Sequence, residues 1–205
     1  MLSAYDPTMF TGIIRATTEV LEHTKKDDLL EITFRRPDGW AINLGDSIAT
    51  NGVCLTVSEL TDTDYKTELM QETLDKTSFG TAIPRQVNLE TSLTLHSLLD
   101  GHIVQGHVDT TGIITARTDS GGSARITVRI ENIDPTLVVP KGSIAIDGIS
   151  LTIADIHNDE VTVSLVDYTL DHTIAGEHWQ VNTMVNIEYD TIGKYIARHL
   201  EHTQN

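Results

Sequence analysis

Residues 45–57 read Gly-Asp-Ser-Ile-Ala-Thr-Asn-Gly-Val-Cys-Leu-Thr-Val, and residues 141–153 read Lys-Gly-Ser-Ile-Ala-Ile-Asp-Gly-Ile-Ser-Leu-Thr-Ile. The second stretch repeats the first at an offset of 96 residues, and the offset holds without a gap from Gly45 to Gly80. Of these 36 aligned positions, 12 are identical. The sequence therefore predicts a duplicated domain, because a period of about 100 residues exceeds the roughly 20–50 residues of a solenoid unit.

Shorter matches extend the repeat in both directions. Residues 87–90, Val-Asn-Leu-Glu, recur as residues 185–188, Val-Asn-Ile-Glu, and residues 11–14, Thr-Gly-Ile-Ile, recur as residues 111–114. We interpret both matches as equivalent positions in the two copies. The predicted organisation is a flexible lead-in over 1–8, a first domain over 9–97, a second over 98–189, and a C-terminal helix and tail over 190–205.

Both copies are predicted to be all-β. Strand-like runs at 10–16, 29–34, 47–49 and 53–58 follow one another closely, with turn residues such as Asn51-Gly52 between them. This spacing favours a small antiparallel barrel over a βαβ arrangement. A hairpin turn is expected at 118–123, whereas residues 72–78 fit a short helix or an extended loop equally well.

The tail has a different pattern. Ile192, Tyr195, Ile196, His199 and Leu200 fall on one face at helical spacing, and Asp190 or Thr191 suits the N-cap. A helix of about ten residues is too short to be stable alone in water. We expect it to pack on its own barrels or on its equivalents in other subunits.

Composition excludes several functions. A net charge of −16 argues against nucleic acid or an anionic membrane surface as partner. Cys54 is the only cysteine, which excludes an internal disulfide and a thiol-rich zinc site. No apolar run approaches the roughly 20 residues of a membrane span, and residues 1–8 lack a signal-peptide pattern. We therefore expect a cytoplasmic protein.

Five motifs, in order, resemble the riboflavin synthase family. They are Met-Phe-Thr-Gly-Ile at 9–13, Gly-Val-Cys-Leu-Thr at 52–56, Gly-His-Ile-Val-Gln-Gly-His-Val at 101–108, Asp-Gly-Ile-Ser-Leu-Thr at 147–152 and Asn-Ile-Glu at 186–188. The resemblance implies an all-β chain with two similar six-stranded antiparallel Greek-key barrels in tandem and a C-terminal α-helix. It also implies a homotrimer, with active sites between the first barrel of one subunit and the second barrel of its neighbour. An association with lumazine synthase, the preceding enzyme, stays open.

The activity that the resemblance implies is the dismutation of two molecules of 6,7-dimethyl-8-ribityllumazine. One molecule gives a four-carbon unit to the other, yielding riboflavin and 5-amino-6-ribitylamino-uracil without a metal or an organic cofactor. Two identical substrates need two similar pockets, which a duplicated domain supplies. The rival function is a non-catalytic lumazine or flavin carrier of the lumazine protein type. Retention of Ser47, Cys54 and His107 in one copy, and of Lys141 and Ser150 in the other, favours the enzyme.

The resemblance also implies which residues bind substrate. The first pocket would consist of Gly12, Ile13, Ile14, Cys54, Leu55, Thr56, Glu68, Leu69, Met70, Gln71, Glu72, Thr73, Gly106, His107 and Val108. The second would consist of Lys141, Ser150, Leu151, Thr152, Ser164, Leu165, Val166, Asp167, Tyr168 and Thr169. Gly12, Leu55 and Leu151 could equally serve the fold alone. Asp167-Tyr168 departs from the family, where Pro followed by His or Glu is common.

Four residues are candidates for catalysis. His107 matches the family's active-site histidine and could remove a proton from the 7-methyl group of one lumazine. Ser47 and Cys54 could assist proton transfer or add to the ring, although a buried structural cysteine is equally consistent. Asp190 could act beside the site or merely cap the helix. His102 would face away from His107 on a continuous strand and is interpreted as structural.

Overall fold

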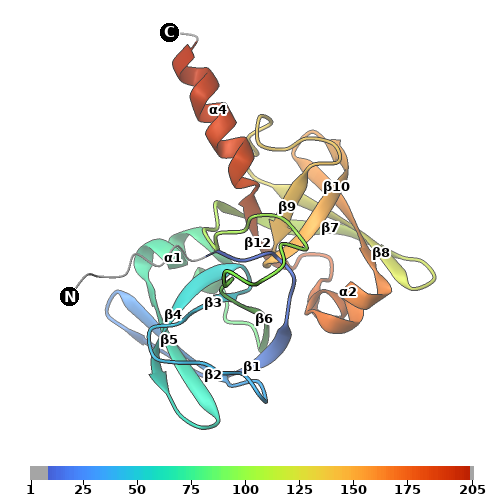
Figure 1. The fold of residues 1–205 in the computed structure, drawn as a ribbon. Helices are drawn as coiled ribbons and strands as arrows, with labels where there is room; N and C mark the ends of the chain where they lie inside the picture. Colours follow the sequence, from blue (N-terminus) through green and yellow to red (C-terminus); the bar gives the residue numbers. More distant parts are fainter. Residues whose placement is uncertain (1–8, 204–205) are drawn as a thin grey trace.

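The computed structural model describes residues 9–203, which form two closed six-stranded antiparallel barrels and a C-terminal helix (Figure 1). The first barrel contains β1 (Ala16–Lys26), β2 (Leu29–Arg35), β3 (Ser47–Thr50), β4 (Val53–Leu60), β5 (Asp64–Met70) and β6 (Gln86–Thr91), in the order β1-β2-β5-β4-β3-β6. The second contains β7 (Thr110–Asp119), β8 (Ser123–Ile130), β9 (Ser143–Ile146), β10 (Ile149–His157), β11 (Glu160–Val166) and β12 (Met184–Tyr189), in the order β10-β11-β8-β7-β12-β9. The predicted fold class is confirmed.

Alternation along the strands explains why each sheet closes around a core. In β4, Val53, Leu55 and Val57 are buried while the residues between them are partly or fully exposed. The equivalent residues of β10, Ile149, Leu151 and Ile153, are likewise buried. Successive strand side chains point to opposite faces, so one apolar face fills each barrel and the other is available for contacts outside it.

Short helices join the strands at equivalent places. α1 (Gln71–Lys76) and the 3-10 turn η1 (Ser78–Gly80) follow β5, while α2 (Asp167–His172) and α3 (Ala175–His178) follow β11. Residues 72–78 are thus largely helical. α4 (Thr191–Thr203) begins directly after β12, as predicted, and extends away from both barrels (Figure 1). Among residues 9–203, none of these helices is long and apolar enough to cross a membrane.

The two barrels are related by a pseudo-two-fold axis, which their shared hydrogen bonds reveal. The Asn88 side-chain amide donates to the Asp147 carbonyl, and the Asn186 side-chain amide donates to the Asn51 carbonyl, both at 2.9 Å. The side-chain oxygens of the same two residues accept the amides of Ile174 and Ser78, respectively. Each asparagine therefore ties its own barrel to the other, in a reciprocal arrangement.

Three details differ from the sequence predictions. The strand expected at 10–16 is absent, since β1 begins at Ala16 and Phe10 instead forms an isolated bridge with Val104. The matching of 11–14 with 111–114 was wrong: Ala16 pairs with Leu89 as Thr110 pairs with Ile187, which makes residues 9–13 equivalent to 103–107. The predicted lead-in, 1–8, lies outside the described residues.

Candidate active site

The segment that precedes each barrel crosses to the other barrel. We call residues Gln105–Val108 the Gly106 segment and residues Thr11–Ile14 the Gly12 segment. The Cys54 amide, on β4 of the first barrel, donates to the Gly106 carbonyl at 2.9 Å, and the Ser150 amide, on β10, donates to the Gly12 carbonyl at 2.7 Å. Each contact joins a leading segment to the outward face of the opposite barrel.

Only glycine fits at the centre of this contact. Gly106 has φ +75°, and a Cβ added there would lie 2.6 Å from the Cys54 Cβ. An L-residue is disfavoured at such a positive φ, and the clash would involve the β4 backbone as well, because the added atom would lie 2.8 Å from the Cys54 nitrogen. The two backbones can therefore approach closely only because Gly106 has no side chain.

A cavity of about 310 Å³ lies beside this contact on the first barrel. Its lining comes from β4, from α1 and from the Gly106 segment: Val53, Cys54, Glu72, Thr73, Lys76, Thr77, Gly106, His107 and Val108. The structure thus brings together six of the predicted first-pocket residues: Cys54, Glu72, Thr73, Gly106, His107 and Val108. We call this group the first cradle. It offers a thiol, an imidazole, hydroxyl groups and both charge signs around one space.

The equivalent place on the second barrel, the second cradle, is formed by Ser150 on β10 and the Gly12 segment. Here the Ser150 hydroxyl lies 2.7 Å from Nδ1 of His102. Burial lowers the pKa of His102, while the nearby Asp190 carboxylate opposes this by raising it. A neutral imidazole hydrogen-bonded to a hydroxyl is an arrangement that can relay a proton.

Two predictions about these groups need correction. Gly12, Ile13 and Ile14 were grouped with Cys54 in the first pocket. The structure instead places Gly12 against Ser150 and packs Ile14 on the core of the second barrel, because the leading segments exchange barrels. The interpretation of His102 assumed a continuous strand over 102–107, and the described chain is irregular there. The motif contains both histidines, but which cradle each one reaches depends on contacts distant in sequence.

Four of the predicted binding residues are leucines whose side chains face the barrel cores. Leu55, Leu69, Leu151 and Leu165 are all buried among core residues. Only their backbone groups are available to a ligand. By contrast, Glu68, Met70, Ser164, Val166 and Tyr168 are exposed, and Gln71 bonds to Asp75 on α1. Tyr168 stacks on His172 within α2, with ring centroids 4.0 Å apart.

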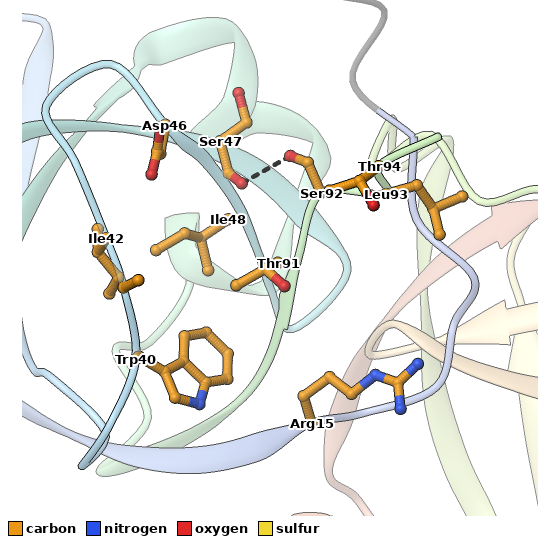
Figure 2. Close-up of a pocket in the computed structure, with 11 residues that line it drawn as sticks. Arg15, Trp40, Ile42, Asp46, Ser47, Ile48, Thr91, Ser92, Leu93 and Thr94 are labelled. Atoms are coloured by element: carbon orange, nitrogen blue, oxygen red, sulfur yellow. Dashed lines mark hydrogen bonds between the residues drawn. The ribbon is translucent and has the colours of Figure 1, made fainter. Parts of the chain in front are cut away.

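Ser47 borders a different, larger cavity of about 530 Å³ (Figure 2). There its carbonyl accepts the Ser92 hydroxyl at 2.8 Å, and its own hydroxyl points away from Trp40 and Arg15 (Figure 2). Ser47 pairs with Thr56 across β3 and β4, so the two side chains share the outward face of the hairpin. Ser47 therefore lies near the predicted residues of β4, although it does not line the first cradle's cavity.

The larger cavity has a filled counterpart on the second barrel. Arg15 and Asp109 are equivalent, since their amides donate to Leu89 and Ile187, which are themselves equivalent. In the second barrel the first turn of α4 occupies this region, and Lys194 pairs with Asp109 at 2.6 Å. The first barrel continues instead as a chain without regular secondary structure over residues 92–94, which leaves the space open.

Asp190 and Lys141 both have contacts that serve the fold. One carboxylate oxygen of Asp190 accepts the Ile192 amide at 2.9 Å at the start of α4. The Asp190 charge also acts on His102, whose pKa it raises. Lys141 is exposed, has φ +68°, and its amide donates to Ile153. Within the part of the chain that the structure describes, no cluster of three or more His, Cys, Asp or Glu side chains could hold a metal ion.

Comparison with known proteins identifies the family. The sequence model of the lumazine binding domain matches this chain twice, at residues 11–92 and 105–190. The chain is 42% identical to riboflavin synthase of Mycobacterium tuberculosis (strain ATCC 25618 / H37Rv), over 93% of this chain and 97% of that protein. The chain belongs to the riboflavin synthase family.

Other members of the riboflavin synthase family agree. The Bacillus subtilis riboflavin synthase is 38% identical over 94% of this chain and 90% of its own length. These relatives identify the chain as an enzyme of this family. Among solved structures, LumP complexed with riboflavin has the same fold, with a TM-score of 0.81 at 21% identity over 88% of this chain and 98% of LumP.

Proposed function

We propose that this enzyme converts two molecules of 6,7-dimethyl-8-ribityllumazine into riboflavin and 5-amino-6-ribitylamino-uracil, by transfer of a four-carbon unit. The observation that carries the proposal is the pair of equivalently built cradles, one centred on Cys54 and Gly106 and the other on Ser150 and Gly12. A reaction between two copies of one substrate needs two sites of similar shape. The relatives named riboflavin synthase support the same reaction.

The positions of the cradles favour a reaction between subunits. α1, whose residues line the first cradle's cavity, lies on the opposite side of the molecule from its equivalent α2 (Figure 1). The two cradles of one chain belong to different barrels, one at β4 and the other at β10. We infer that the first cradle of one subunit faces the second cradle of another.

The C-terminal helix supports an oligomer, which we propose is a homotrimer. Ile192, Tyr195, Ile196 and Leu200 on α4 are each more than half exposed. Within residues 9–203, the first turn of the helix is bonded to the rest of the chain through Lys194 with Asp109 and Thr191 with Gln105. An exposed apolar stripe on a helix of this length needs a partner, and equivalent helices supply one with matching shape.

Each cradle has a group that can move the proton. In the first cradle, His107 lies beside Cys54 and could take the proton from the 7-methyl group. In the second, His102 stays neutral more readily because burial lowers its pKa, so it could exchange protons with a substrate through the Ser150 hydroxyl. Backbone amides and carbonyls near the glycines would hold the pteridine ring.

Incubation of the purified protein with 6,7-dimethyl-8-ribityllumazine tests the proposal. We expect riboflavin to appear in its absorbance spectrum, with one riboflavin formed for every two lumazines consumed. Tight binding of lumazine without product would contradict the proposal and support the carrier. Detection of 5-amino-6-ribitylamino-uracil in equal amount to riboflavin would confirm the stoichiometry. We expect the reaction to take place in the cytoplasm, which fractionation of cells would check.

A further inference from the structure

Two buried glutamates hold the leading segments in place. Glu188, on β12, is 2% exposed, and Glu90, the equivalent residue on β6, is 3% exposed. One oxygen of the Glu188 carboxylate accepts the Gln105 amide at 2.7 Å, and the other accepts the amides of Gly106 and His107 at 2.9 and 3.1 Å. A single side chain therefore bonds to three consecutive amides of the Gly106 segment.

Glu90 does the same for the Gly12 segment. One of its oxygens accepts both the amide and the hydroxyl of Thr11 at 2.7 Å, and the other accepts the Gly12 amide at 2.9 Å. Burial raises the pKa of both glutamates, although the hydrogen bonds and nearby cations oppose that rise. Burying a carboxylate costs free energy, and the cost is offset only where donors converge on it as they do here.

The held segments complete the cradle of the opposite barrel. Glu188 belongs to the second barrel, yet the Gly106 segment that it fixes contacts Cys54 on the first barrel and places His107 beside the first cradle's cavity. Glu90 belongs to the first barrel, and the Gly12 segment contacts Ser150 on the second. A loop held by three charge-assisted bonds keeps one position, which suits a site that recognises its ligand through backbone groups.

We propose that Glu188 and Glu90 are positioning residues of the lumazine reaction, each acting across the barrel interface on the cradle of the other barrel. This inference rests on the proposed function. Glu188 sets the position of Gly106 and His107 in the first cradle, and Glu90 sets that of Gly12 in the second. Neither carboxylate lines the first cradle's cavity, so each acts through the segment it holds.

Cys54 provides a reporter confined to one cradle. It is the only cysteine in the chain, so protein labelled with [15N]cysteine has a single labelled amide, and that amide donates directly to Gly106. Its resonance reports on the position of the Gly106 segment without ligand. The change of that resonance during titration with 6,7-dimethyl-8-ribityllumazine gives the Kd of the first cradle.

The test compares Glu188→Gln with Glu90→Gln. A glutamine keeps one acceptor but turns a donor group toward amides that also donate, so each substitution should loosen one segment. We expect E188Q to shift the ligand-free Cys54 resonance and to raise the first cradle's Kd at least tenfold. E90Q changes an equally buried glutamate in the same way, so it should leave the Cys54 resonance at its wild-type position and the first cradle's Kd within about twofold of wild type. Turnover should fall in both variants.

Three other outcomes would overturn the inference or the proposed function. An E188Q protein with wild-type Cys54 resonance and wild-type Kd would overturn the inference, as would an E90Q protein that weakens the first cradle as much as E188Q. If lumazine does not move the Cys54 resonance of the wild-type protein, the proposed function fails and the inference with it. Should E188Q not fold, Glu188→Asp, which withdraws the carboxylate by one methylene, has the same expected effects.

Discussion

Asp147 is a carboxyl group buried at the contact between the barrels. One of its oxygens accepts the Asn186 amide at 2.8 Å and the other accepts the Trp179 indole N–H at 2.8 Å. Burial raises its pKa to about 7, although both hydrogen bonds favour the charged form. Asn51, its equivalent in the first barrel, accepts the Asn88 amide at 2.7 Å without carrying a charge. Asp147 should therefore make the stability of the fold depend on pH.

The sign of that dependence follows from the raised pKa. The unfolded chain has an aspartate pKa of about 3.9, so between that value and about 7 the folded protein binds more protons than the unfolded one. The stabilisation from Asp147 is complete below about pH 4 and is lost as the pH rises through 7. We expect the free energy of unfolding of wild type, relative to Asp147→Asn, to fall between about pH 4 and about pH 7 and to stay constant above that. Urea denaturation at several pH values measures this, and a constant difference between the two proteins would contradict it.

His107 should matter for turnover more than for binding. It is exposed beside the first cradle, so Gln in its place disturbs little packing but cannot take up a proton at neutral pH. We expect His107→Gln to lower kcat at least about tenfold, since general acid–base catalysis typically contributes about 10²–10⁴-fold, with the Kd for lumazine nearly unchanged. His96→Gln is the control, because His96 is an exposed histidine in the chain segment that connects the two barrels. Unchanged turnover in His107→Gln would remove this residue from the mechanism.

Single residues were predictable only where a motif carried them. Cys54 and His107 were identified from their motifs, and the structure places both at one cavity. The bond between His102 and Ser150 was not predicted, because these residues are 48 positions apart and meet only when the leading segments exchange barrels. The roles of Glu90 and Glu188 were missed for the same reason, although both end a recognised repeat motif.

At the scale of elements, predictions succeeded where the signal was local. The apolar face of α4 was evident from five residues at helical spacing, and the helix begins at Thr191 as expected. β1 was misplaced because most of its side chains are exposed, so Ala16–Lys26 carries little of the alternation that marks a strand. Its strand character comes from pairing with β2, which follows it directly in a hairpin, and with β6, which is distant in the sequence.

The exposed face of α4 predicts how the oligomer can be broken. Ile196 is 56% exposed, so a charge there should not disturb the barrels of a single chain. In a helix bundle, however, Ile196→Glu would place like charges together in an apolar seam. We expect this variant to have a lower mass in analytical ultracentrifugation than wild type, while Arg198→Gln, away from the apolar face, keeps the wild-type mass. A wild-type protein that sediments as a single chain would contradict the prediction.

At the scale of the whole molecule, the barrels meet through backbone and polar groups around the pseudo-two-fold axis. Asn51, Asn88, Asp147 and Asn186 are almost completely buried there, and each makes a hydrogen bond that spans or borders the interface. A small apolar cluster of Phe10, Ala49, Val104 and Ala145 lies beside them. Polar groups that are fully paired in this way specify one arrangement of the barrels, because any displacement leaves buried groups unsatisfied.

Gly52 tests how tightly that arrangement is fixed. It lies opposite Gly148, and a Cβ added at Gly52 would be 2.6 Å from the Gly148 nitrogen and 3.0 Å from its Cα. Gly39 is the matched control, since its φ of +77° is nearly that of Gly52, +76°, but a Cβ there would meet nothing within 4 Å. Gly39→Ala should therefore cost only the roughly 1–2 kcal/mol of a left-handed alanine.

Gly52→Ala should cost about 1–3 kcal/mol more than Gly39→Ala, because the added methyl group overpacks a contact between two backbones that no rotamer change can relieve. Urea denaturation of both variants, with a common slope, gives the difference. Equal losses in the two variants would mean that the barrels separate at this point without penalty. The reciprocal hydrogen bonds would then not fix their relative position, and neither barrel could hold a leading segment reliably against the cradle of the other.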